Sequence, residues 1–150
     1  MRGTMDEIEK MVAYKKQGFY CSQILILMGL DMLGKSNPDL VGAAQGLAGG
    51  LGFQGELCGS LTGSACLLGL YAGKKVPGDE EDPRLDFMIE DLVKWFQSTI
   101  GEKYGGCRCD DILGKQPGNQ TTRCPVIVAD SFQKVKDLLV ENGFELTDSE

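Results

Sequence analysis

Apolar residues recur at helical intervals in several segments of the chain, and charged or glycine-containing breaks separate these segments. In residues 5–18, Ile8, Met11 and Val12 recur at helical intervals with charges elsewhere, which predicts an amphipathic helix that ends at Gly18. Residues 19–34 are strongly apolar without alternation and predict a buried helix. Strand-like alternation is scarce, so helices dominate the predicted structure.

Proline indicates where three later helices begin. The three start signals are Asn37-Pro38, Asp82-Pro83 and Cys124-Pro125. In each, the first residue is read as the N-cap and proline takes the first helical position, where its missing N–H costs nothing. Residues 85–96 carry an apolar stripe at a spacing of 3.6 residues, which predicts a face turned toward the core. The last helix is expected to stop at Asn142-Gly143.

The central stretch, residues 40–73, contains a single charge, Glu56. Its length would suit a membrane hairpin. However, eight glycines between Gly42 and Gly63 make it only weakly hydrophobic. This favours two core helices joined by a glycine turn. The predicted fold is therefore all-α: one domain spanning residues 1–150, with five or six helices around a central glycine-rich helix pair.

Composition narrows the function classes. The net charge of −7 disfavours binding to nucleic acid and to anionic membranes, both of which require basic residues. The first residues lack the apolar run of a secretory signal, so we expect a cytoplasmic location. Six cysteines in that reducing compartment indicate metal binding or redox chemistry. The absence of histidine excludes Ser-His-Asp catalysis and imidazole-ligated zinc, and there is no C-x-x-C redox motif.

Four of the cysteines fall at predicted helix starts. They are Cys21, Cys58, Cys109 and Cys124. A helix N-terminus carries unpaired amides and a partial positive charge, which lower the pKa of a thiol and stabilise its thiolate. Before Cys58, glycines at residues 52–55 let the backbone turn tightly and present its N–H groups.

The other two cysteines and two glycines after Cys58 are further candidates, for which structural roles are weighed against functional ones. Cys66 is expected to be a small apolar residue of the core, whereas Cys107, two residues before Cys109, is either a ligand pair with it or a strained redox pair. Gly59 and Gly63 are candidate contacts for a cofactor, although close helix packing explains their spacing more simply.

The carboxylate of Glu56 has two possible roles. It either caps the start of the following helix, where a negative charge interacts favourably with the helix dipole, or carries protons beside Cys58. Of the two roles, the capping role is the favoured interpretation.

The sequence segments around the cysteines resemble those of the C_GCAxxG_C_C family of redox-active proteins. These segments are FYCSQ, GGLGFQGELCGSLTG, CDDILG and RCPVIVADSF. The resemblance extends over about residues 10–140. In this chain the central block reads Cys58-Gly59-Ser60 rather than Gly-Cys-Ala, and its last glycine is Gly63. The resemblance implies that Cys21, Cys58, Cys109 and Cys124 are the functional set.

Three hypotheses follow. In the first, the four thiols converge for thiol–disulfide exchange or electron transfer, with Cys58 as nucleophile and Cys109 or Cys21 as its partner. A redox partner protein or a small-molecule thiol or disulfide would then react with this thiol-dependent oxidoreductase. In the second, the same four cysteines ligate an iron–sulfur cluster or zinc, although their spacings match no compact ferredoxin or zinc ribbon. In the third, the chain is a non-catalytic helical interaction protein. Assembly into a homo-oligomer is compatible with all three.

Overall fold

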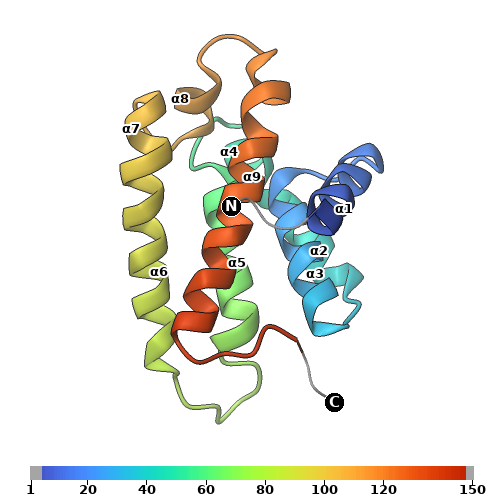
Figure 1. The fold of residues 1–150 in the computed structure, drawn as a ribbon, viewed down its shortest axis with the longest axis vertical. Helices are drawn as coiled ribbons and strands as arrows, with labels where there is room; N and C mark the ends of the chain where they lie inside the picture. The colour runs from blue at the N-terminus through green and yellow to red at the C-terminus, as the bar shows by residue number, and fades with distance from the viewer. Residues whose placement is uncertain (1–4, 148–150) are drawn as a thin grey trace.

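In a computed structural model, which describes residues 5–147, the chain is a bundle of α-helices (Figure 1). The elements are α1 (Met5–Lys16), α2 (Cys21–Leu33), α3 (Pro38–Ala44), η1 (Gln45–Leu47), α4 (Ala48–Leu51), α5 (Gly59–Ala72), α6 (Pro83–Phe96), η2 (Gln97–Gly101), α7 (Glu102–Tyr104), α8 (Cys109–Leu113) and α9 (Asn119–Glu141). The described residues form no strand beyond one isolated bridge. The all-α prediction is confirmed, and the expected count of five or six helices is slightly low because several segments are a single turn.

Helix α5 runs through the middle of the bundle and packs against α2, α6 and α9 (Figure 1). Its contact with α2 is close because glycines face the partner helix on both sides. A Cβ added to Gly63 would lie 3.0 Å from the Cα of Ser22, and one added to Gly29 would lie 2.9 Å from the Cγ of Leu67. The two helices that begin with Cys21 and follow Cys58 are therefore held side by side.

The proline signals are correct for α3 and α6. The Asn37 side chain accepts a hydrogen bond from the amide of Leu40 at 3.1 Å, and the Asp82 side chain accepts one from the amide of Arg84 at 3.0 Å. These bonds satisfy amides that a helix start would otherwise leave unpaired. The stop signal is also correct, because Asn142 is the C-cap of α9.

The predicted start of the last helix at Cys124 is wrong. Helix α9 begins at Asn119, so Cys124 and Pro125 lie inside it. Pro125 lies past the first turn, where it removes the hydrogen bond that its amide would have donated to the carbonyl of Thr121 and its ring crowds that carbonyl. Contacts outside the helix anchor the extra turn: the Asn119 side chain donates to the carbonyl of Leu113 at 2.8 Å.

The glycine turn before α5 is a short left-handed helical turn. Five consecutive residues have φ between 62° and 76°, and two of them, Leu51 and Phe53, are not glycine. At Gly50 the turn also requires the absence of a side chain, since a Cβ there would lie 2.4 Å from the backbone N and O of Glu56. Residues 38–51 form three short helical segments rather than one long helix, so the central glycine-rich element on this side is irregular.

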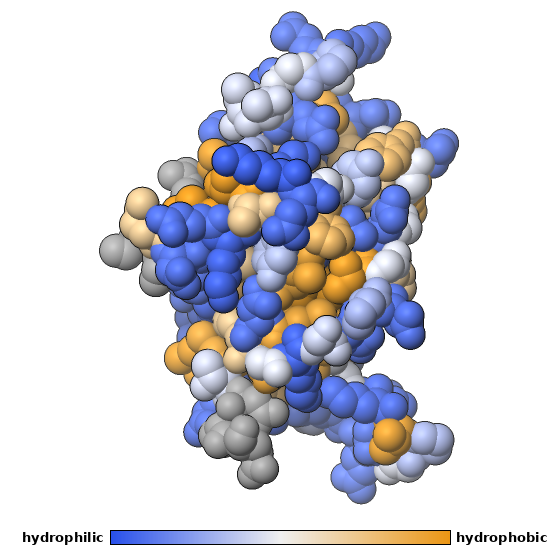
Figure 2. All heavy atoms as spheres, turned by 90° about the vertical axis from the view of Figure 1, so that its right-hand side faces the viewer, coloured by the Kyte–Doolittle hydropathy of each residue, from blue (hydrophilic) through white to orange (hydrophobic). Residues whose placement is uncertain are grey.

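Hydrophobic side chains gather in the middle of the face formed by α1 to α3, with hydrophilic residues around them (Figure 2). Within residues 5–147, no helix combines the length and the apolar character that crossing a membrane requires.

Candidate functional site

Main-chain hydrogen bonds join the start of α5 to the start of α8. The amide of Cys58 donates to the carbonyl of Cys107 at 2.9 Å, and the amide of Cys109 donates to the carbonyl of Glu56 at 2.7 Å. Between them, Leu57 and Arg108 form an isolated antiparallel bridge. Two helix N-termini that are far apart in the sequence therefore lie together, each with its cysteine.

Cys58 is the N-cap of α5 and is buried, with 5% of its surface exposed. Its Sγ accepts a hydrogen bond from the amide of Ser60 at 3.4 Å. The neighbouring Cys109 side chain stabilises the Cys58 thiolate, and this is the main reason why the pKa of Cys58 falls to about 7. Burial acts in the opposite direction, and the amides of Ser60 and Leu61 help to outweigh it. The prediction that helix amides stabilise this thiolate is thus supported, with Cys109 as an additional and larger contribution.

Cys109 is the first residue of α8 and is half-buried. Its pKa is strongly raised, first because its thiol donates to Cys58, and then by burial and by the negative charge of the Cys58 thiolate. The amide of Gly59 donates to its sulfur and acts the other way. The first amides of α5 are therefore shared between two thiols.

Cys21 is the first residue of α2 and its sulfur lies over the backbone of Gly59, where an added Cβ would meet it at 2.7 Å. The pKa of Cys21 rises to about 12 because of burial, and the nearby charges of Cys58 and Cys124 raise it further. Cys21 is accordingly held in its protonated form.

Cys124 approaches the same cluster from the second turn of α9. Burial and the charge of Cys58 raise its pKa to about 11, against the opposing effect of the Lys15 ammonium group on α1. The structure places Cys21, Cys58 and Cys109 at adjoining helix starts, whereas Cys124 is related to them through the charge effects on its pKa. Among the four cysteines, only Cys58 has a lowered pKa, and the pKa values of the other three are raised. The four thiols therefore differ in how readily they ionise.

The other two cysteines differ from each other. Cys107 lies beside the cluster: its carbonyl accepts the Cys58 amide, and its sulfur packs against Gly101, where an added Cβ would lie 3.1 Å away. Burial and the charge of Cys58 raise its pKa. The expectation that Cys66 is a core residue is wrong, because Cys66 is exposed on α5, next to the fully buried Leu67.

Glu56 neither caps α5 nor hydrogen-bonds to a thiol. Cys58 is the N-cap, and the Glu56 carboxylate lies 3.3 Å from the guanidinium of Arg108, with both side chains about half exposed. Gly59 and Gly63 are buried in the contact between α2 and α5, so their observed role is close packing.

Sequence reasoning missed Ser60, whose amide donates to the Cys58 sulfur at 3.4 Å and whose side chain lowers the pKa of both Cys21 and Cys58. The only signal for it in the sequence is its position two residues after an N-cap cysteine. Cys107 was left ambiguous because a main-chain carbonyl has no signature in the sequence.

The described part of the chain contains no group of three or more acidic, cysteine or histidine side chains arranged to hold a metal ion. The strongest mutual effect on the pKa values of the thiols is the one between Cys58 and Cys109.

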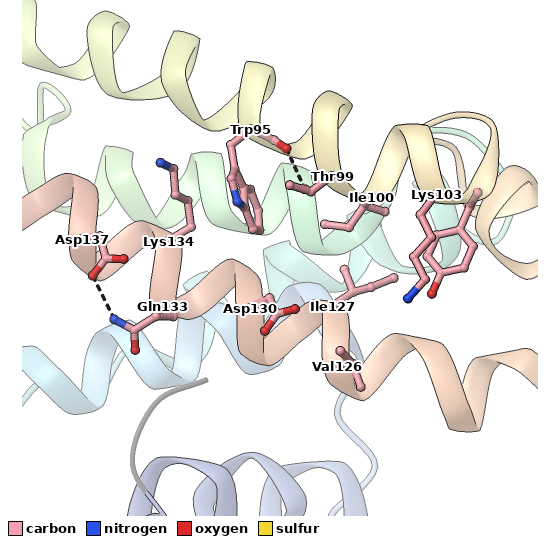
Figure 3. Close-up of a pocket in the computed structure, with 11 residues that line it drawn as sticks. Trp95, Thr99, Ile100, Lys103, Val126, Ile127, Asp130, Gln133, Lys134 and Asp137 are labelled. Carbon is pink, nitrogen blue, oxygen red and sulfur yellow. Dashed lines mark hydrogen bonds between the residues drawn. The ribbon is translucent and has the colours of Figure 1, made fainter. Parts of the chain in front are cut away.

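A separate groove of about 590 Å³ lies between the α6–α7 arm and α9 (Figure 3). Its walls include Trp95, Ile100, Lys103, Ile127, Asp130 and Lys134. No cysteine lines it, so the groove and the thiol cluster are distinct features.

An all-α bundle that places partly buried cysteines at adjoining helix starts defines a helical cysteine-motif protein. The family model described as "Putative redox-active protein (C_GCAxxG_C_C)" matches residues 19–138, and the chain belongs to this family. No curated protein and no solved structure matches the chain.

Proposed function

We propose that the protein carries out thiol–disulfide exchange, with Cys58 as the attacking thiolate and Cys109 as the resolving thiol. The observation that carries this proposal is the placement of Cys58 and Cys109 at two adjoining helix starts, held by the main-chain bonds from the Cys58 amide to the carbonyl of Cys107 at 2.9 Å and from the Cys109 amide to the carbonyl of Glu56 at 2.7 Å. It gives one sulfur of the pair a pKa of about 7 and leaves the other protonated. A thiol whose pKa lies near ambient pH is close to the optimum for attack on a disulfide.

The first step is attack of the Cys58 thiolate on one sulfur of a substrate disulfide. A bond forms between Cys58 and that sulfur, the substrate S–S bond breaks, and the other substrate sulfur leaves as a thiolate. Cys58 then carries no charge and accepts no proton. The two effects of Cys58 that raise the pKa of Cys109 disappear at this moment, while burial still raises it and the Gly59 amide still favours its ionised form.

The second step follows from this change. Cys109 loses its proton to the departing thiolate or to water and attacks the Cys58 sulfur. A Cys58–Cys109 disulfide forms and the second substrate sulfur leaves as a thiolate. Overall, two electrons pass from the cysteine pair to the substrate disulfide, and the reverse sequence oxidises a dithiol.

The experiment uses Cys109→Ser, which removes the resolving sulfur but keeps a hydroxyl donor. Because the exposed Cys66 would react by itself, the test is made in a Cys66→Ser background. Treatment with a small disulfide such as hydroxyethyl disulfide should leave a stable mixed disulfide on Cys58, located by peptide mass spectrometry. The matched control, Cys66→Ser alone, should proceed to a Cys58–Cys109 disulfide.

A mixed disulfide that accumulates on another cysteine while Cys58 stays free would overturn the proposal. So would stoichiometric iron or zinc in protein purified without oxygen, if any single substitution among the four cysteines removed it. That result would favour the metal-binding alternative.

A further inference from the structure

Exposed apolar side chains gather in the turn that leads to Cys58. Large hydrophobic residues are exposed at nine positions within residues 5–147, and three of these, Leu51, Phe53 and Leu57, fall in the seven residues directly before Cys58. Their exposed fractions are 49%, 58% and 45%. The other six are scattered over α1, α6, α9 and the loop after α5. Such a group, unlike a single exposed residue, calls for an explanation. We call Leu51, Phe53 and Leu57 the apolar rim.

Two residues of the apolar rim also have an unfavourable backbone conformation. Leu51 and Phe53 have φ values of 63° and 65°, and no other non-glycine residue in the described part of the chain has a positive φ. Bulky side chains are disfavoured in this left-handed region, which glycine and asparagine adopt more readily. The turn thus keeps two apolar side chains on the surface although both solvent and backbone favour other residues. Strain of this kind concentrates at functional sites.

The apolar rim lies beside two of the helix starts that carry thiols. Leu57 immediately precedes Cys58, the N-cap of α5. The ring of Phe53 meets the ring of Tyr20 edge-on, with the centroids 5.2 Å apart, and Tyr20 is the residue before Cys21 at the start of α2. A molecule that covers the apolar rim is therefore placed next to the thiols.

The main chain of Leu57 has unused hydrogen-bonding groups. In the antiparallel bridge between Leu57 and Arg108, the hydrogen bonds are made by the residues on either side, so the N–H and C=O of Leu57 turn away from Arg108. Within residues 5–147, neither group has a hydrogen-bond partner. An extended polypeptide supplies both an acceptor and a donor, as a strand does when it adds to the edge of a sheet.

Cys58 itself offers little surface for recognition. Only 5% of its surface is exposed, so contacts with the thiol alone cannot hold a disulfide substrate. The affinity has to come from the surroundings of Cys58, which here are apolar side chains and unpaired main-chain groups. A protein segment with apolar residues beside its cysteine complements both features. A small polar disulfide complements neither.

We propose that the substrates are protein disulfides in which apolar residues flank the cysteine, and that the apolar rim binds this segment in an extended conformation. The sulfur chemistry remains that of the proposed function, in which Cys58 attacks the disulfide. This inference deepens the proposed function and rests on it for the identity of the nucleophile.

Three disulfides test this substrate class in the Cys66→Ser background. The first is hydroxyethyl disulfide. The other two are the symmetric disulfides of acetyl-Leu-Cys-Leu-amide and acetyl-Ser-Cys-Ser-amide, which have the same backbone and differ in the flanking side chains. The rate of thiol release is measured, and the modified cysteine is located by mass spectrometry. The leucine peptide should react with Cys58 at least about tenfold faster than the serine peptide, because burial of a leucine side chain strengthens binding by at least that factor.

Asparagine can replace two of the rim residues without adding backbone strain, since it adopts a positive φ more readily than they do. In the double variant Leu51→Asn/Phe53→Asn, the preference for the leucine peptide should fall to about twofold or less. The rate with hydroxyethyl disulfide should stay that of the parent protein. Phe87→Asn is the matched control and should keep the preference, because Phe87 is 65% exposed near the start of α6, which lies at the opposite end of the bundle from α8 (Figure 1).

Leu57→Thr keeps the test decisive if the double variant does not fold. Leu57 has no positive φ to preserve, and threonine suits an extended backbone. This variant should reduce the preference for the leucine peptide by about threefold or more. Equal rates with the two peptides in the parent protein, or a preference that survives in the rim variants, would overturn the substrate class and leave Cys58 as the nucleophile. If none of the three disulfides modified Cys58, the proposed function would fail as well.

Discussion

The carbonyl of Glu56 accepts a hydrogen bond from the amide of Cys109 at 2.7 Å. Together with the bond from the Cys58 amide to the carbonyl of Cys107, it sets the separation of the two helix starts. The sulfurs of Cys58 and Cys109 are thus placed by backbone geometry, which responds little to changes of surface side chains. The unequal pKa values of the two thiols follow from that placement.

The alkylation of Cys58 by iodoacetamide should show a midpoint near pH 7 in reduced wild-type protein. Its pKa is lowered to about 7, so the thiolate fraction is high above that pH and falls tenfold for each unit below it. Cys66 is exposed, but the protein around its sulfur partly desolvates it and raises its pKa, so it should show a higher midpoint in the same timed, quenched samples.

The absolute rate of alkylation of a cysteine depends on access to its sulfur as well as on its ionisation. Ionisation alone would make Cys58 react faster than Cys66 near neutral pH, but Cys66 is exposed and Cys58 is not. Access therefore favours Cys66 while ionisation favours Cys58. A Cys58 midpoint at the value of an ordinary thiol would contradict the lowered pKa whatever the rates are.

Gly59→Ala should destabilise the reduced protein by about 1–3 kcal/mol, because the new methyl group would meet the sulfur of Cys21 at 2.7 Å in a well-packed contact. Gly69→Ala, on the same helix with open space around it, should stabilise by about 0.5–1 kcal/mol. Denaturant unfolding with a reductant present measures both. Two variants of equal stability would show that α2 and α5 can separate at Gly59 at little cost.

Gly50→Ala should be among the most damaging substitutions in the chain. The alanine would have to adopt a φ of 76° and would place its Cβ 2.4 Å from backbone atoms of Glu56. Backbone atoms cannot move aside as a flexible side chain can, so we expect a loss above about 3 kcal/mol. Gly52→Ala has a φ of 62° but open space, and should cost only about 1–2 kcal/mol.

The damage at Gly50 should also reach the thiols, since Glu56 provides the carbonyl that holds Cys109. A Gly50→Ala protein that folds should therefore show a raised Cys58 midpoint. Gly52→Ala serves as the control, and loss of stability without any change in the midpoint would show that the turn and the thiol pair are independent.

Glu56→Gln should change stability by less than about 1 kcal/mol, because the ion pair with Arg108 is half exposed and screened by solvent. The midpoint of Cys58 alkylation should also stay where it is, since the carboxylate faces Arg108. Arg108→Gln should behave alike. If only Glu56→Gln moved the midpoint by a full unit, a proton-carrying role for Glu56 would have to be restored.

Signals that act within a few residues were predictable from the sequence. Asn37 and Asp82 each satisfy an amide in the first turn of their own helix, so residue type and spacing were sufficient. Cys21 and Cys109 begin helices for similarly local reasons. The start of α9 was not predictable, because a distant contact, from the Arg123 guanidinium to the carbonyl of Ile112, helps to extend the helix before Pro125.

The face on which Cys66 lies could not be predicted either. Helix α5 is apolar nearly all round, so its hydrophobic pattern does not distinguish its buried side from its exposed side. The pairing of Cys58 with Cys109 depends on main-chain bonds between distant segments, which no residue type encodes. The four-cysteine set was identified from its helix starts and family words, whereas the inequality among its thiols required the structure.

The links that align the two thiols are made by main-chain atoms at residues 55–58 and 107–110. Relatives could therefore diverge freely in the side chains at positions 56, 57 and 108 and keep the same sulfur geometry. Proline is the exception, because at position 58 or 109 it would delete a donor as well as the thiol, and at 110 it would delete the amide that bonds to Gly55. The relative placement of Cys58 and Cys109 should therefore tolerate substitution of the residues next to them in the sequence.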